Sequence, residues 1–162
     1  MRRICTFFGH REIPHDLQPT LLEQARNAVA QYGIIEFWNG GYGAFDALAA
    51  DVIRELRLEY PDIQHRRVYA YPPEHPYEGT LFDQAFCPDC LDQYADRARI
   101  PRRNIWMAEQ SRLIIAYVCH AESTIHEPLD HALRLNIPII NLGCYQPTAS
   151  LYWWEESDLQ SD

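Results

Sequence analysis

Hydrophobic residues along the chain form short runs that alternate with stretches of helical spacing. The runs predict five buried strands: Ile4–Phe8, Ile34–Trp38, Arg67–Tyr71, Leu113–Cys119 and Ile137–Leu142. Apolar residues three or four positions apart predict helices over Thr20–Tyr32, Ala44–Glu59, Asp89–Arg97, Pro101–Ser111 and Pro128–Leu135. This alternation predicts an α/β fold, a three-layer Rossmann-like domain with a mainly parallel five-stranded sheet.

The length of 162 residues suits a single domain with one sizeable core. We expect this Rossmann-like domain to span residues 1–143, with an irregular, proline-containing insertion at about 72–100. Residues 144–162 form an acidic tail that contains Trp153 and Trp154. Aromatic residues are enriched at subunit contacts, so the tail suggests a homo-oligomer.

A glycine-rich turn follows the second predicted strand, with Gly40, Gly41 and Gly43 ahead of a helix that carries Asp46. Ligands of parallel α/β sheets bind beyond the carboxyl ends of the strands. Glycines let a ligand approach the backbone closely, and the amides that begin a helix favour an anion. The turn therefore predicts a phosphate or carboxylate site, with a plain tight turn as the alternative. Asp46 either orients the turn or supplies charge at the helix start.

Two other segments are expected at the same edge of the sheet. Gly9, His10 and Arg11 leave the first strand, and Arg103 and Asn104 lie near the start of a later helix. Guanidinium and imidazole groups there suit the phosphate of a small anion. The alternatives are an ordinary surface loop for the first segment and a solvated helix face for the second.

The charged residues exclude several classes of cofactor and ligand. All 14 basic residues are arginine, and the absence of lysine removes pyridoxal-phosphate chemistry and a standard P-loop. The formal net charge of −9 disfavours binding to a nucleic-acid backbone. A local basic face around Arg97, Arg99, Arg102 and Arg103 leaves single-stranded DNA binding as a third interpretation.

The cysteine pattern and the lengths of the apolar runs indicate the cellular compartment. The five cysteines are odd in number and not spaced as a disulfide framework, which is typical of reduced thiols. No apolar run approaches the ~18 residues that a membrane span needs. We therefore expect a cytoplasmic protein with no membrane partner.

The sequence Cys87-Pro88-Asp89-Cys90 allows three interpretations. Two thiolates at this spacing are half of a zinc site, and His75 lies upstream as a third ligand. A redox dithiol at the start of a helix is the second interpretation. The third is that the pair does neither, because such half-sites arise often by chance.

Four ordered blocks resemble a known superfamily: CTFFGHRE, GGYGAFDALAADVIRELRLEYP, RRNIWMAEQSRLIIAYV and ALRLNIPIINL. Together they are similar to the YpsA-like branch of the SLOG superfamily, which joins DNA-processing protein A to the LOG ("lysine decarboxylase-like") proteins. The resemblance implies a Rossmann-like fold with a pocket for nucleotides or nucleotide-derived ligands. It places in that pocket Gly9, His10, Arg11, Gly40, Gly41, Gly43, Asp46, Arg103 and Asn104.

The chain departs from that superfamily after the fourth predicted strand. Ser123 and Thr124 replace a glycine pair, and Asp130 falls where a glutamate is expected. Serine and threonine can cap a helix and donate hydroxyls to a phosphate, so they remain candidate ligand-binding residues. The PGGxGTxxE motif of the LOG enzymes that cleave nucleoside monophosphates is absent.

Two functions remain at this stage. The first is binding or sensing of a nucleotide or nucleotide-derived phosphate ligand, and the missing motif favours it. The second is a hydrolase that cleaves an N-glycosidic or phosphoester bond of such a ligand. Asp130 or Glu127 would then be the catalytic carboxylate.

Overall fold

The computed structural model describes residues 2–40, 43–72, 84–121 and 123–144, with residues 123 and 124 described by their backbone only. Gly41, His75 and most of the predicted tail therefore lie outside the described residues, as does much of the predicted insertion.

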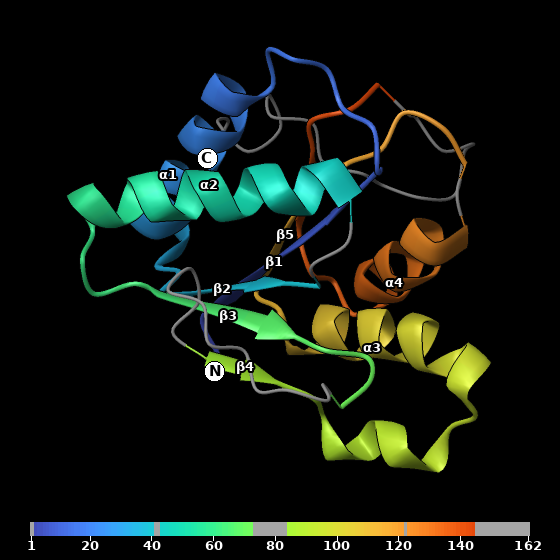
Figure 1. The fold of residues 1–162 in the computed structure, drawn as a ribbon. Helices are drawn as coiled ribbons and strands as arrows, with labels where there is room; N and C mark the ends of the chain where they lie inside the picture. Colours follow the sequence, from blue (N-terminus) through green and yellow to red (C-terminus); the bar gives the residue numbers. More distant parts are fainter. Residues whose placement is uncertain (1, 41–42, 73–83, 122, 145–162) are drawn as a thin grey trace.

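All strands of the sheet are parallel, which confirms the predicted α/β class. They are β1 (Ile4–Gly9), β2 (Glu36–Asn39), β3 (Gln64–Val68), β4 (Gln84–Phe86), β5 (Leu113–Tyr117) and β6 (Ile139–Asn141). The spatial order is β4-β3-β2-β1-β5-β6, and each neighbouring pair is parallel. Helices cover both faces, as the predicted three layers require (Figure 1).

The predicted number of strands was wrong, because the sheet has six strands and not five. The additional strand β4 is a three-residue segment at the edge of the sheet, inside the region predicted to be an irregular insertion. It begins with an exposed glutamine, and within the described parts of the chain it pairs with β3. So short an edge strand leaves no hydrophobic pattern to detect.

The third strand also begins earlier than predicted. It covers Gln64–Val68, whereas the pattern favoured Arg67–Tyr71. Only His65 and Val68 are fully buried in it, because β3 lies between β2 and the short edge strand. Val68 is the one apolar residue among the five of β3, so the strand has no apolar run to mark its start.

The helices lie in pairs on the two faces of the sheet (Figure 1). Helices α1 (Gln18–Tyr32) and α2 (Gly43–Glu59) cover one face, and α3 (Asp96–Gln110) and α4 (Ser123–Arg134) cover the other. A 3₁₀ helix, η1 (Asp89–Gln93), precedes α3.

The predicted boundary at Pro101 was wrong. Pro101 lies in the second turn of α3, which runs without interruption from Asp96. A proline there removes one backbone hydrogen bond. The helix continues because Arg99 and Arg103, on either side of the proline, are both buried and bound to neighbouring elements.

Each face of the sheet has its own hydrophobic core. In β5, Leu113 and Ile115 pack toward α1 and α2, whereas Ile114 and Ala116 pack toward α3 and α4. Burial on both faces explains why the strand reads as a continuous apolar run.

The strand order reverses direction next to β1. The chain moves from β1 through β2 and β3 to β4 on one side, and then returns to place β5 and β6 on the other. In open parallel sheets the crevice at this point, beyond the carboxyl ends of the strands, is the usual ligand site. None of the helices in the described parts of the chain has the length and apolarity to cross a membrane.

Candidate functional site

A cavity of about 240 Å³ opens at the carboxyl edge of the sheet. It brings together residues from the loop after β1, the end of β2 and helices α2, α3 and α4. Six of the residues that the sequence predicted line it: Gly9, Arg11, Gly40, Asp46, Arg103 and Asn104. The apolar part of the lining was not predicted, because its side chains carry no chemistry that a motif would reveal: Phe7, Phe8, Ile100 and Ile125.

Arg103 is the buried cation of this cavity, with only 3% of its surface exposed. Its Nη1 donates hydrogen bonds to the carbonyl oxygens of Gly40 at 3.1 Å and Val68 at 3.0 Å. Its Nε donates to the Oδ1 of Asn104 at 2.8 Å. These three acceptors are neutral, and together they fix the orientation of the guanidinium group.

Asp46 is positioned by a buried chain of hydrogen bonds that the sequence did not reveal. The Nδ2 of Asn39 donates to the backbone oxygen of Asp46 at 3.0 Å and to its Oδ1 at 3.3 Å. The Nε2 of His65 lies 2.6 Å from the Oδ1 of Asn39. Because an amide oxygen only accepts, His65 donates from Nε2. The end of β2 thus fixes the carboxylate at the start of α2, and a histidine inside β3 holds that end in place.

The glycines of the two loops are required by close contacts. A Cβ on Gly9 would lie 2.3 Å from the ring of Phe45, and a Cβ on Gly40 would lie 3.1 Å from the guanidinium carbon of Arg103. Gly43, the first residue of α2, has a φ of +87° and would place a Cβ 2.9 Å from the Cα of Arg11. The backbone of the predicted glycine turn is therefore packed directly against the cavity's arginines.

His10 is directed away from the cavity, although its neighbours on both sides line it. The side chain is 4% exposed, and its Nε2 accepts a hydrogen bond from the backbone N–H of Cys119 at 2.9 Å. Its ring stacks on His120 at a centroid distance of 3.9 Å. His10 thus joins the loops after β1 and β5, and its predicted contact with the ligand stays a prediction.

The two catalytic candidates do not line the cavity. Glu127 is exposed and Asp130 is half-buried on α4, whereas Ile125 contributes to the lining from the first turn of the same helix. Ser123 and Thr124 begin α4, so their backbone lies near this edge, but their side chains are outside the described residues.

The segment with Cys87 and Cys90 lies apart from this cavity, beside η1. The Sγ of Cys87 accepts a hydrogen bond from Nη2 of Arg99 at 3.5 Å, and Cys90 is exposed. Within the described residues no group of three or more His, Cys, Asp or Glu side chains is placed to hold a metal ion. His75, the predicted third ligand, lies outside those residues, so a zinc site here stays a prediction.

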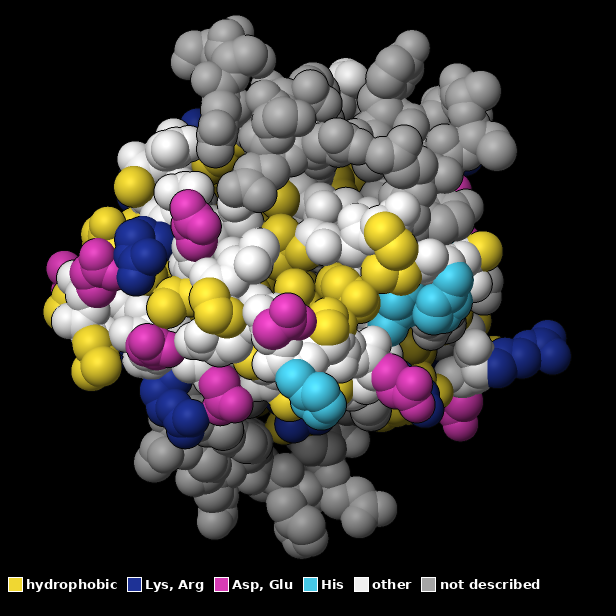
Figure 2. Space-filling view, turned by 90° about the horizontal axis from the view of Figure 1, so that it is seen from above, with side chains coloured by type: hydrophobic (Ala, Val, Ile, Leu, Met, Phe, Trp, Pro, Cys, Tyr) yellow, Lys and Arg dark blue, Asp and Glu magenta, His cyan; other side chains and the backbone are white. Residues whose placement is uncertain are grey.

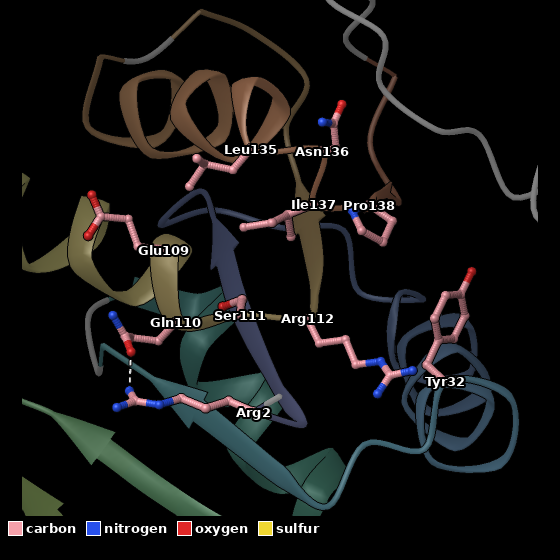
Figure 3. A pocket seen from close by; sticks show the side chains of 10 residues that line it. All are labelled: Arg2, Tyr32, Glu109, Gln110, Ser111, Arg112, Leu135, Asn136, Ile137 and Pro138. Carbon is pink, nitrogen blue, oxygen red and sulfur yellow. Dashed lines mark hydrogen bonds between the residues drawn. The ribbon is translucent and has the colours of Figure 1, made fainter.

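A larger groove of about 550 Å³ lies at the opposite edge of the sheet (Figure 3). Arg2 and Arg112 precede β1 and β5, and the Nη1 of Arg2 donates a hydrogen bond to Gln110 at the end of α3. Leu135 and Ile137 line the same groove between α4 and β6. Parallel α/β sheets bind ligands at their carboxyl edge, so we regard the smaller cavity as the candidate site.

Charges of both signs are interspersed on the face seen from above, on the side of α1 and α2 (Figure 2). These two helices also form ion pairs: Arg54 with Asp51 within α2 at 2.9 Å, and Arg26 of α1 with Glu59 of α2 at 2.8 Å. The basic side chains coloured in this view therefore do not form a single continuous patch.

Comparison with protein-family models and with curated proteins gives no match. Solved structures that are similar to this chain include the following three. The molybdenum cofactor binding protein from the phototrophic bacterium Rippkaea orientalis has a TM-score of 0.59 and 16% identity, over 90% of this chain and 78% of that chain. DNA processing protein A from Helicobacter pylori has a TM-score of 0.59 and 14% identity, over 91% and 67%. The molybdenum cofactor carrier protein from Chlamydomonas reinhardtii has a TM-score of 0.53 and 15% identity, over 86% and 76%.

These likenesses confirm the Rossmann-like fold that the resemblance to the SLOG superfamily implied. At such low identity they establish the fold alone, and the YpsA-like branch stays a prediction. They also correct one expectation, because the net charge led us to disfavour nucleic acid. DNA processing protein A has this fold and binds single-stranded DNA, so that exclusion was wrong. Net charge sums over the whole surface, whereas binding depends on the charge at one site.

Proposed function

We propose that the cavity at the carboxyl edge of the sheet binds a nucleotide or a nucleotide-derived ligand through its phosphate. The observation that carries the proposal is the pairing of a buried, oriented arginine with an exposed one across a glycine-lined cavity. Arg103 lies on the α3 side and Arg11 on the β1 side. Two arginines that line one cavity from separate elements favour an anion with several acceptor oxygens.

The rest of the lining suits the sugar of such a ligand. The carboxylate of Asp46 can accept hydrogen bonds from ribose hydroxyls, and it is fixed in place through Asn39. The apolar side chains of Phe8, Ile100 and Ile125 give the cavity a wall that excludes water. Its volume of about 240 Å³ is below the ~300–1,000 Å³ of drug-sized ligand sites, which fits the phosphate and sugar better than a whole dinucleotide.

The names of similar structures widen the set of ligands to test. Two of them bind the molybdenum cofactor and one binds single-stranded DNA. Because these proteins share the fold of this chain, we include both of their ligands among the compounds to be tested at the cavity.

The experiment is a thermal-shift screen of the purified chain, followed by calorimetric titration of each stabilising compound. The panel contains nucleoside monophosphates, nucleoside triphosphates, ADP-ribose, dinucleotides, molybdenum cofactor and a short single-stranded oligodeoxynucleotide. A ligand present at 100 times its Kd stabilises the native state by about 2.7 kcal/mol. We expect a phosphate compound to stabilise the protein and to be recovered intact.

The matched variants are Arg11→Ala in the cavity and Arg54→Ala on the outer surface of α2. Arg11→Ala should weaken binding about tenfold, which is about 1.4 kcal/mol, and Arg54→Ala should leave it unchanged. Equal binding by both variants contradicts the assignment of the cavity. Released base or phosphate in the product analysis would instead indicate the hydrolase, whose candidate carboxylates Glu127 and Asp130 do not line the cavity.

A further inference from the structure

We propose that Cys119 and Cys144 form a redox-active thiol pair, in which a peroxide oxidises Cys119 and Cys144 then closes a disulfide with it. The pair lies where the loops after β5 and β6 meet, beside the point at which the strand order reverses. The proposal is independent of the ligand that the cavity binds.

The two residues are in direct contact. The backbone N–H of Cys144 donates a hydrogen bond to the Sγ of Cys119 at 3.3 Å, and the two thiols are hydrogen-bonded to each other. A disulfide requires Cβ atoms ~3.5–4.5 Å apart, and a residue whose own amide touches the partner sulfur needs only a small adjustment to reach it. Cys119 is half-buried and Cys144 is exposed, so a small oxidant can reach the pair.

A clamp formed by Asn141 holds the two loops in register. The Oδ1 of Asn141 accepts hydrogen bonds from the backbone N–H of Val118 at 2.9 Å and of Gly143 at 3.0 Å. Its Nδ2 donates to the carbonyl oxygen of Val118 at 3.2 Å. Val118 and Gly143 are thus tied to one side chain, and the residues that follow them are the two cysteines.

Gly143 lets the loops approach as closely as the clamp requires. A Cβ at this position would lie 2.2 Å from the carbonyl oxygen of Val118, closer than any side-chain carbon can come. A third attachment comes from the β1 loop, where His10 accepts the N–H of Cys119. The contact between the cysteines is therefore built into the ends of three strands.

The surroundings assign different roles to the two thiols. Burial raises the pKa of the Cys119 thiol. Hydrogen bonds from the Tyr117 hydroxyl and from Cys144 lower that pKa by more than burial raises it, so it lies below its usual value. The hydrogen bond with Cys119 and the negative charge of that thiolate raise the pKa of Cys144. Cys119 is thus the nucleophile and Cys144 the thiol that resolves the intermediate.

Tyr117 remains a donor throughout this chemistry. Its hydrogen bond to Cys119, together with burial, raises the pKa of its phenol to about 12. The hydroxyl therefore keeps its proton at neutral pH and can stabilise the thiolate of Cys119.

The reaction balances with hydrogen peroxide as the oxidant. The thiolate of Cys119 attacks one peroxide oxygen, the O–O bond breaks, and the second oxygen leaves as hydroxide and takes up a proton to become water. The sulfur of Cys144 then attacks the sulfenic acid of Cys119, the S–O bond breaks, and a second water forms with the proton of Cys144. The two thiols together lose two electrons, which the peroxide accepts.

The test treats the reduced full-length protein with hydrogen peroxide, blocks the remaining thiols and maps the peptides by mass spectrometry. We expect a linked peptide that joins Cys119 to Cys144 and disappears on reduction. In Cys144→Ser a sulfenic acid should accumulate at Cys119, where a dimedone probe detects it. The matched control is Cys90→Ser, which changes another exposed cysteine and should leave the linked peptide in full yield.

Two further variants test the geometry and the activation separately. Asn141→Ala removes the clamp and should reduce the yield of linked peptide, and Tyr117→Phe should slow the oxidation of Cys119 at least about threefold. The proposal is overturned if Cys119 oxidises no faster than Cys90. It is also overturned if oxidised Cys119 accumulates without a bridge to Cys144, or if the bridge joins Cys119 to another cysteine.

Discussion

The two sides of the candidate cavity each present an arginine, but the two arginines are held in opposite ways. On the α3 side Arg103 is buried, and it donates hydrogen bonds to Gly40, Val68 and Asn104. On the β1 side the side chain of Arg11 is exposed, and its backbone oxygen accepts a hydrogen bond from the N–H of Ala44 at 3.0 Å. On the α3 side one residue therefore both holds the fold together and makes the proposed contact with the ligand. On the β1 side the backbone holds the fold, and the side chain is left to make the proposed contact.

The largest effect is expected on the α3 side. Arg103→Ala should lower the free energy of unfolding by about 3 kcal/mol, because two backbone carbonyls and an amide oxygen lose their donor in a buried site. Urea unfolding measures this difference, with Arg54→Ala as the exposed control. A loss below about 0.5 kcal/mol would mean that Arg103 does not hold α3 against the ends of β2 and β3.

The backbone of the β1 side should be nearly as sensitive, although its arginine is not. Gly9→Ala should lower the free energy of unfolding by about 2 kcal/mol, because the added methyl group overlaps the ring of Phe45 at 2.3 Å. In a Phe45→Ala background the same substitution should cost clearly less, since alanine lacks the Cγ and Cδ1 atoms that the added methyl group overlaps. Equal losses in both backgrounds would show that the two residues are not in contact.

The side chain of Arg11 is where the two sides should differ most. Arg11→Ala should change the free energy of unfolding by less than about 0.5 kcal/mol, because the side chain is exposed. The same variant should lower the affinity for a phosphate ligand about tenfold. Urea unfolding and calorimetric titration of one preparation measure the two quantities together. A large loss of stability would remove the distinction between the two sides.

Much of the fold could be predicted from the sequence, because strands buried on both faces leave continuous apolar runs. The runs at β1 and β5 marked the centre of the sheet, where the strand order reverses. The strands at the β3–β4 edge of the sheet could not be predicted correctly, because they lack such apolar runs. Strand β4 has three residues and β3 has Val68 as its one apolar residue, so neither carries the pattern.

The candidate site could be predicted only where a residue type carries its own signal. Arginines and loop glycines predicted the cavity. Asn39 and His65 were missed, because an amide or an imidazole within a predicted strand gives no sign that it makes a buried hydrogen bond. The cysteines make the same point. The spacing of Cys87 and Cys90 drew attention, whereas the contact of Cys119 with Cys144 joins loops after two different strands and exists only in the folded chain.

The smallest effect concerns the carboxylate that lies between the two sides. Asp46→Asn keeps the shape of the side chain and the hydrogen bond from Asn39 to the backbone of residue 46. Affinity for a nucleoside monophosphate should fall about threefold, because a neutral amide accepts less strongly from the ribose hydroxyls. Affinity for inorganic phosphate, which has no sugar, should rise instead, because a negative charge has been removed from the lining. Calorimetric titrations at low and high salt measure both effects, and the gain for inorganic phosphate should shrink as salt increases. If both affinities rise together, Asp46 opposes the anion without contacting the sugar, and the ligand is then oriented by the arginines on the two sides alone.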